Sequence, residues 1–115
     1  MSADSIELSA ERIDAVFSAL AHSTRRSILV QLRRGSATVS ELAKQFTVSP
    51  PAISKHLRVL ERAGLLVQKK EGRVRHCYLV VDPLADASEW LEQYRQFWEN
   101  NLDSLEAYLA ESADQ

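Results

Sequence analysis

The sequence is short of the residues that build disulfide frameworks, membrane spans and Gly-rich ligand loops. Its single cysteine, Cys77, excludes an intramolecular disulfide and any zinc site made of several cysteines. Its three glycines are isolated from one another, so no Gly-rich loop is present to wrap a phosphate. No apolar run approaches the roughly 20 residues that cross a bilayer. The N-terminal residues 1–11 contain no Lys or Arg, unlike a secretory or mitochondrial signal, and we therefore expect a reducing, cytoplasmic location.

Groups for catalysis are missing as well. An enzyme needs a nucleophile with a base, a pair of carboxylates, a phosphate loop or a metal site, and we find none of these patterns. The three histidines, His22, His56 and His76, are too scattered for a metal cluster. We therefore expect no enzymatic activity, no cofactor and no metal.

What the sequence does have is an uneven distribution of charge along 115 residues, a length that suits one domain. Residues 1–21 carry a net charge of −3 and residues 81–115 carry −8. Between them, residues 22–80 hold twelve basic and three acidic side chains, a net charge of +9. A basic centre between acidic ends is typical of a module that binds a polyanion on one face. The alternative is that the basic run is only a solvated surface.

Apolar residues at helical spacing predict three longer helices. We expect the first to be capped by Ser9 and to end near residue 21, and the second to start near Ser23 and stop at Gly35. A long amphipathic helix fits about residues 85–110.

Between residues 38 and 63 two shorter helices are predicted. Thr38 to Glu41 form a capping box, with a hydroxyl at the N-cap and a carboxylate three residues later. Ser49 is a second hydroxyl cap, and Pro50 follows at the first helical position, where a missing N–H costs nothing. The segment 65–80 then changes to a strand-like period around Gly72, which predicts a β-hairpin, and Pro83 ends the run.

Two short helices followed by a basic hairpin describe a winged helix-turn-helix, a mostly α fold with a small β-hairpin. The N-terminal part of the second helix suits the major groove of double-stranded DNA, and exposed caps suit phosphates. The hairpin, or wing, carries basic side chains that can follow the neighbouring DNA phosphates, and Arg73, beside Gly72, can enter a minor groove. The residues expected to face DNA are Thr38, Ser40, Ser49, Pro50, Ser54, Lys55, His56, Arg58, Arg62, Lys70, Arg73 and Arg75.

Several of these assignments have structural alternatives. His56 can donate to a phosphate or pack inward, and Arg58 and Arg62 can touch backbone phosphate or remain solvated. Arg25 and Arg26 can pair with a helix end instead of DNA. Cys77 is expected to be a buried, inert thiol, with a redox switch as the alternative.

Four segments stand out together: AHSTRRSIL (residues 21–29), SELA (40–43), SPPAISKHLRVL (49–60) and AGLL (63–66). In this combination they resemble the ArsR/SmtB family of bacterial and archaeal winged-helix repressors. The resemblance covers residues 13 to about 80 and implies a homodimer held together by the first and last helices, residues 9–21 and 84–110. The two recognition helices would then enter successive major grooves, about 34 Å apart, on a pseudo-palindromic operator.

The apolar face of the C-terminal helix supports a dimer independently, because it is larger than a core of this size needs; the alternative is that it belongs to the core of the monomer. The residues expected at the interface are Ile13, Val16, Phe17, Leu20, Trp90, Leu91, Tyr94, Trp98, Leu102, Leu105 and Leu109.

The sequence departs from metal-sensing relatives at both of their usual sites. Residues 41–46 lack the cysteines that such relatives carry there, and residues 84–115 contain no histidine. The C-terminal stretch resembles a metal-independent branch, for which no inducer is implied. Pro50 also replaces the usual Gln or Ser after the cap, which removes one base contact.

We therefore expect a single DNA-binding domain over residues 1–115, acting as a repressor in the bacterial or archaeal nucleoid. Two other hypotheses remain: a repressor that responds to oxidants through Cys77, and a winged helix that binds protein or RNA. The basic wing argues against the last, because a protein-binding version would tend to lose it.

Overall fold

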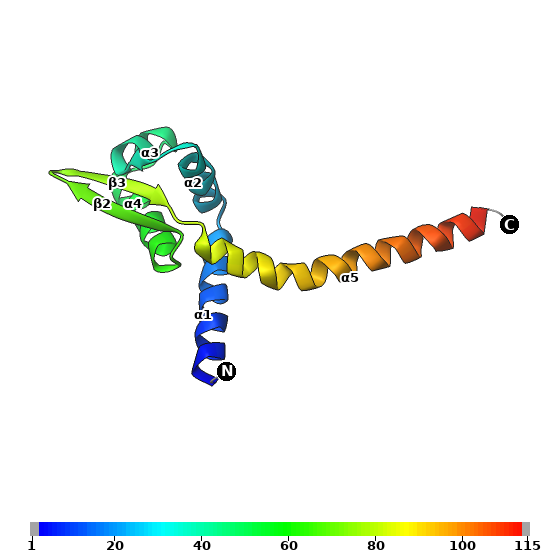
Figure 1. Cartoon of the computed structure of the whole chain (residues 1–115). Coiled ribbons are helices and arrows are strands. Elements are labelled where there is room, and N and C mark those ends of the chain that lie inside the picture. Colours follow the sequence, from blue (N-terminus) through cyan, green and yellow to red (C-terminus); the bar gives the residue numbers. More distant parts are fainter. Residues whose placement is uncertain (1–2, 114–115) are drawn as a thin grey trace.

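The computed structural model describes residues 3–113, which form helices packed on a small sheet, with one long helix projecting away (Figure 1). The order of elements is that of a winged helix-turn-helix. In chain order they are α1 (Ala3–Leu20), α2 (Ser23–Arg34), β1 (Ala37–Thr38), α3 (Val39–Gln45), α4 (Pro50–Arg62), β2 (Leu66–Glu71), β3 (Val74–Leu79) and α5 (Asp82–Ala113).

The two terminal helices begin earlier than the sequence predicted. Helix α1 starts at Ala3 and runs through Ser9, so the expected cap at Ser9 is wrong. Residues 3–8 contain neither Gly nor Pro, so no helix breaker marks a start at Ser9. Helix α5 starts at Asp82. Pro83 therefore lies in its first turn, where its missing N–H costs nothing, and begins a helix instead of ending a strand.

The core lies where α1, α2, α3 and α4 meet the base of the sheet. Each helix contributes apolar residues at helical spacing from one face, as the periodicity predicted. The most deeply buried side chains are Val16, Ile28, Leu42, Ile53, Leu57, Leu60, Leu65, Leu66 and Cys77.

The sheet has three strands in the order β1-β3-β2, all antiparallel. The hairpin of β2 and β3 was predicted, but β1 was not, because two residues are too few to show a strand period. Strand β1 forms because the free edge of β3 accepts it, with Ala37 opposite Cys77 and Thr38 opposite His76. This short strand ties the start of α3 to the base of the wing.

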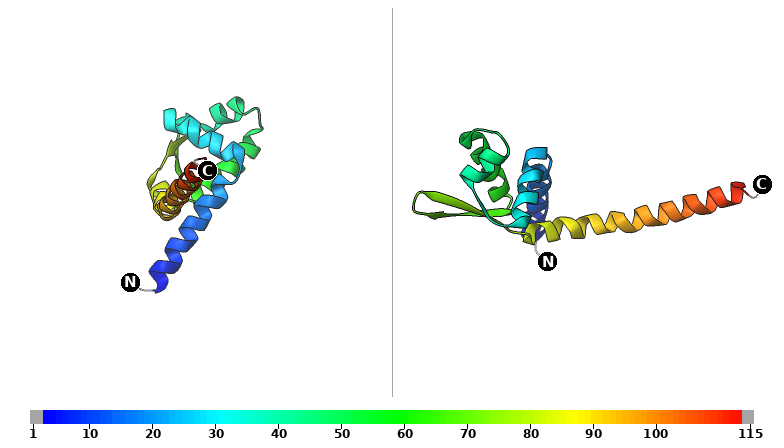
Figure 2. Two further views of the ribbon diagram at one scale, coloured as in Figure 1. Left: turned by 90° about the vertical axis from the view of Figure 1, so that its right-hand side faces the viewer. Right: turned by 90° about the horizontal axis from the view of Figure 1, so that it is seen from above.

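Helix α5 leaves the globular part at its base, contacts α1 through about its third turn and then projects away (Figures 1 and 2). Its last buried residue is Ala87, and Trp90 packs edge-on against Phe17 of α1 with ring centroids 5.6 Å apart. From there the helix extends into solvent, so the longest dimension of the molecule is 71 Å. None of the described helices combines the length and apolarity that a membrane crossing requires.

Candidate DNA-binding surface

Both helices of the helix-turn-helix begin at the caps that the sequence predicted. The Thr38 hydroxyl accepts a hydrogen bond from the Glu41 backbone N–H at 3.1 Å and donates one to the Glu41 carboxylate at 3.1 Å. At the start of α4, Ser49 Oγ accepts from the Ala52 N–H at 3.3 Å, with Pro50 at the first position. The two hydroxyls are thus committed to their helices, and their exposed neighbours Ser40 and Pro50 are free to approach a ligand.

The turn between α3 and α4 is held from the inside. Phe46 and Val48 are half-buried against the core, and the Val48 N–H donates to the Ala43 carbonyl at 3.1 Å. Between them Thr47 has φ +54°, a left-handed conformation that a β-branched residue rarely adopts. A turn locked in this way fixes the angle at which α4 meets α3.

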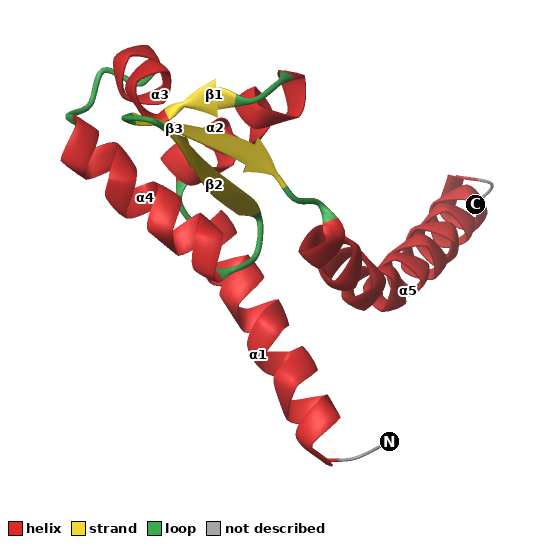
Figure 3. Ribbon diagram, turned by 60° about the vertical axis from the view of Figure 1, so that its left-hand side comes forward, coloured by secondary structure: helices red, strands yellow, loops and turns green. Residues whose placement is uncertain are grey.

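Helix α4 separates its buried and exposed faces clearly. Ile53, Leu57 and Leu60 are buried, whereas Lys55, Arg58 and Arg62 are exposed (Figure 3 shows α4 beside the sheet). Arg62 lies in the last turn, roughly 18 Å along the axis from the start of the helix at 1.5 Å per residue. Among the residues of α4 that are predicted to contact DNA, Arg62 is therefore the furthest from the N-terminal end of the helix.

The wing folds against the recognition helix. Arg75 on β3 donates from Nη2 to Ser54 Oγ on α4 at 3.3 Å, and Arg75 stands opposite Lys70 on β2 in the hairpin register. Lys70, Arg73 and Arg75 are all exposed.

A concave surface joins three of these elements. The start of α3, the start of α4 and the wing contribute its lining, which is Thr38, Val39, Ser40, Pro50, Arg73, Val74 and Arg75. Residues from three separate segments of the sequence therefore meet at one polar hollow that carries two arginines.

His56 lies two residues after Ser54 and therefore on the opposite side of α4 from the bond to Arg75. Its environment was one of the alternatives that the sequence did not decide. Its Nδ1 is 3.5 Å from Arg25 Nη1, and its half-buried ring packs on that of His22. Burial, with the neighbouring positive charges of His22, Arg25 and Lys55, lowers the pKa of His56 below 6.5. The ring of His56 thus packs against the start of α2 on one side, and its contact with a phosphate stays a prediction.

The arginine pair at the start of α2 closes the end of α1. Arg25 donates to the carbonyls of Ala19 at 2.7 Å and Ser18 at 3.0 Å, and Arg26 donates to that of Leu20 at 2.7 Å. The bonds to Ala19 and Leu20 satisfy carbonyls at the end of α1, and the Ser18 carbonyl also accepts from the Ala21 N–H at 3.2 Å. The pair is therefore structural. His22, whose Nδ1 accepts from the Thr24 N–H at 3.2 Å, caps α2.

Cys77 is fully buried in β3, at 0% exposure. Burial raises the pKa of its thiol to about 11, so the reactive thiolate is scarce near neutral pH. This environment fits the inert thiol and disfavours the redox alternative.

The apolar stripe of α5 is exposed, not part of the core. Phe97 is 68% exposed and Trp98 is 64% exposed, which rules out the alternative that the stripe fills the protomer. Exposed with them are Trp90, Leu91, Tyr94, Leu102, Leu105, Tyr108 and Leu109.

The residues of α1 behave differently from those of α5. Val16, expected at the dimer interface, is 1% exposed and belongs to the protomer core, because it faces the other helices and not solvent. The half-buried residues are Ile13, Phe17 and Leu20, and part of each side chain is exposed to solvent.

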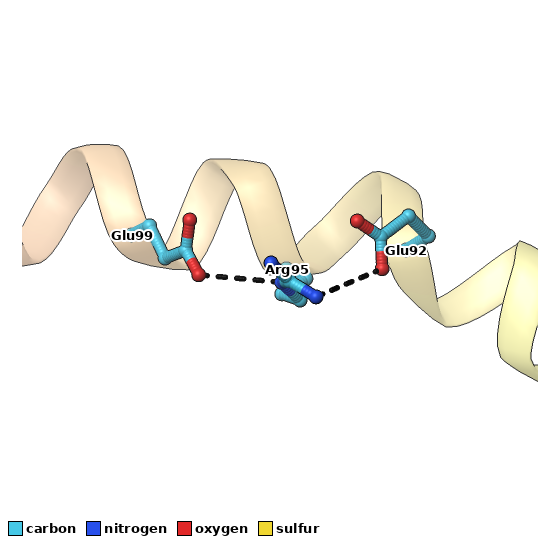
Figure 4. Close-up of polar contacts among 3 residues, drawn as sticks. All are labelled: Glu92, Arg95 and Glu99. Carbon is cyan, nitrogen blue, oxygen red and sulfur yellow. Dashed lines mark hydrogen bonds and ion pairs between the residues drawn. The ribbon is translucent and has the colours of Figure 1, made fainter.

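The projecting helix is also strongly acidic. Arg95, the one basic side chain from residue 82 to residue 113, pairs with Glu92 at 3.6 Å and Glu99 at 3.2 Å along the same helix (Figure 4). Between residues 100 and 113, the acids have no ion pair with any residue that the structure describes.

Several known proteins are similar to this chain in sequence and in fold. Residues 22–68 match the model of the bacterial regulatory protein family arsR. The transcriptional repressor SdpR of Bacillus subtilis is 32% identical over 76% of this chain and 97% of its own length. The HTH-type transcriptional regulator Rv2034 of Mycobacterium tuberculosis is 35% identical over 88% of this chain and 92% of its own length.

Among solved structures, that of an ArsR family transcriptional regulator is 42% identical and superposes with a TM-score of 0.73, covering 78% of this chain and 93% of that one. Both the sequence and the winged helix-turn-helix structure of this chain are therefore similar to those of ArsR-family regulators. The chain belongs to the ArsR family of bacterial transcriptional regulators.

Proposed function

We propose that the protein represses transcription as a homodimer that binds a pseudo-palindromic operator and excludes the polymerase. The observation that carries this proposal is the polar hollow in which the starts of α3 and α4 meet Arg73 and Arg75 of the wing. It presents helix N-termini and guanidinium groups together, the two features that suit a DNA backbone beside a major groove.

In this proposal the first turns of α4 enter the major groove. Lys55 is exposed there and can reach base edges or phosphate, while Ser54 is held by Arg75 and sets the angle of the wing. Arg73, next to Gly72 at the tip of the hairpin, follows the backbone toward the adjacent minor groove. Arg58 meets backbone phosphate from the exposed side of the helix, and Arg62 is the more distant phosphate contact.

The dimer is supported by the exposed stripe of α5 and by the remaining surface of α1 beside it. A contiguous apolar face of this extent on a projecting helix is unfavourable in water unless another surface covers it. A second copy supplies a matching stripe, and the resulting two-fold symmetry sets two recognition helices on successive major grooves, about 34 Å apart.

Fluorescence anisotropy tests the proposal. The purified protein is titrated into the intergenic duplex upstream of its own gene and into a shuffled duplex, across a salt series, with the molar mass measured on the same sample. We expect a dimer that prefers the upstream duplex and loses affinity steeply with salt, as phosphate contacts require. No binding to either duplex at low salt would overturn the proposal in favour of a protein-binding module.

A further inference from the structure

An apolar groove lies at the base of α5, apart from the DNA-facing hollow. It is formed by α2, the end of β3 and the first turn of α5, and it is lined by Leu29, Val30, Arg33, Leu79, Val81 and Leu84. Val30 is 46% exposed and Val81 is 56% exposed, so the groove is open to solvent in the single chain. Its only charged lining residue is Arg33, and within the described range no carboxylate lies in ion-pair distance of that guanidinium.

The distal part of α5 has the complementary chemistry. From residue 96 to residue 113 it carries four acidic side chains and no basic one. Its apolar stripe continues through Leu102, Leu105 and Leu109, all exposed. An acidic helix with a leucine face matches a groove with an apolar floor and an arginine at its rim.

The spacing of the stripe indicates a second helix as its cover. Apolar residues recur at steps of four and three, with one extra four-residue step, at positions 84, 87, 91, 94, 98, 102, 105 and 109. This is the seam of a coiled coil with one stutter. The stripe begins at Leu84, which also lines the groove, so the two surfaces are continuous.

Docking in that groove requires an antiparallel pairing of the two α5 helices, because the groove lies at the base of α5 and the acidic leucine segment lies at its far end. An antiparallel pair centred between Gln96 and Phe97 places Glu92 level with Asn101 and Glu106 level with Ala87.

The same register brings leucines together. When Leu91 stands opposite Leu102, Leu84 stands opposite Leu109, because both pairs are centred on the same point of the helix. Residues 88–113 span about 39 Å at 1.5 Å per residue, which is long enough to carry Leu109 to the partner's Leu84.

We propose that the distal half of α5 from one protomer docks in the partner's groove between α2, β3 and the base of α5. Leu105 and Leu109 cover the apolar floor, and the acidic flank of the helix faces Arg33. The inference rests on the homodimer of the proposed function and adds its orientation, its register and a second contact surface. Each protomer's α2 is then tied to the other protomer's C-terminal helix.

Cross-linking between two variants, each with one cysteine added to Cys77, tests the docking. Val30→Cys and Leu109→Cys are prepared separately, mixed to exchange subunits, and treated in the folded state with a short bismaleimide. Cys77 is buried and unreactive, and the unsubstituted protein checks this. We expect a cross-linked dimer from the mixture. In the control, Lys44→Cys replaces Val30→Cys; Lys44 is exposed on α3 and lies outside the groove, so no cross-link should form.

A charge reversal provides the second arm. Arg33→Glu should raise the dimer dissociation constant about tenfold, since a like charge then faces the acidic helix. Arg34→Glu, the exposed neighbour that does not line the groove, is the matched control and should change it little.

The outcomes separate this inference from the proposed function. A dimer by molar mass that gives no Val30–Leu109 cross-link overturns the docking and leaves the homodimer standing. A chain that carries both Val30→Cys and Leu109→Cys is the last check: a cross-link within that one chain at high dilution overturns the docking as well, because the groove would then hold its own helix. A monomer that binds no operator would contradict the proposed function itself.

Discussion

The imidazole ring of His56, in the middle of the recognition helix, lies 4.5 Å from the ring of His22, the cap of α2, measured between centroids. Arg25, which closes the end of α1, is the third member of this cluster. The orientation of α4 is thus coupled to the junction of α1 and α2, which lies outside the helix-turn-helix.

This cluster predicts a pH dependence of stability. The folded protein favours neutral His56, because its pKa is lowered from 6.5 by burial and by the charges of His22, Arg25 and Lys55. The unfolded chain therefore binds more protons as the pH falls through about 6.5, and the free energy of unfolding decreases. Urea denaturation between about pH 7.5 and pH 5.5 should show a smaller decrease for His56→Gln.

Lys55→Ala is expected to weaken operator binding by about 1–3 kcal/mol and to reduce the preference over a shuffled duplex, because this exposed side chain lies on the face that enters the groove. Anisotropy titrations on both duplexes measure the two effects. Lys44→Ala removes an exposed lysine of α3 that does not line the hollow and serves as the control. Equal affinity for the operator in wild type and Lys55→Ala would mean that the recognition surface is wrongly placed.

Arg73→Ala should act without regard to sequence. A wing arginine on backbone phosphate contributes equally to both duplexes, so its loss should weaken both and reduce the slope of log affinity against log salt by about 1. The salt series described above measures this slope. A selective loss on the operator alone would instead indicate base contact in the minor groove.

Gly64→Ala should destabilise the fold by roughly 1–2 kcal/mol, the usual cost of a left-handed conformation for a residue with a Cβ. Gly64 has φ +78°, and an added Cβ would lie 3.2 Å from Pro83 Cγ. Thermal or urea denaturation measures the change. Gly72→Ala is a matched comparison, because it shares a positive φ of +63° but has nothing within 4 Å, so its cost should be smaller.

The Cys77 thiol should react with iodoacetamide slowly in the folded protein and quickly in urea, since its pKa is raised to about 11 and its side chain is buried. Mass spectrometry of timed samples follows the reaction. DNA binding should be equally insensitive to peroxide in wild type and Cys77→Ser. A peroxide effect that the substitution abolishes would restore the redox-responsive repressor.

The sequence by itself determined the features that depend on a few neighbouring residues. The capping box of Thr38 and Glu41, the Ser49-Pro50 start of α4 and the hairpin around Gly72 all appear as expected. The two caps join residues three positions apart, and the hairpin turn joins Glu71 to Val74, so the local pattern is sufficient to start each element. The winged helix-turn-helix followed from the order of these elements.

The tertiary structure alone decided which surfaces of those elements are used. Helical periodicity marks an apolar face but not its cover, so Val16 and Trp98 looked alike in sequence although one is buried and the other is exposed. Strand β1, the bond from Arg75 to Ser54 and the cluster of His22 with His56 join residues 21 or more positions apart. Such contacts depend on how the packed core brings distant segments together, and no local propensity encodes them.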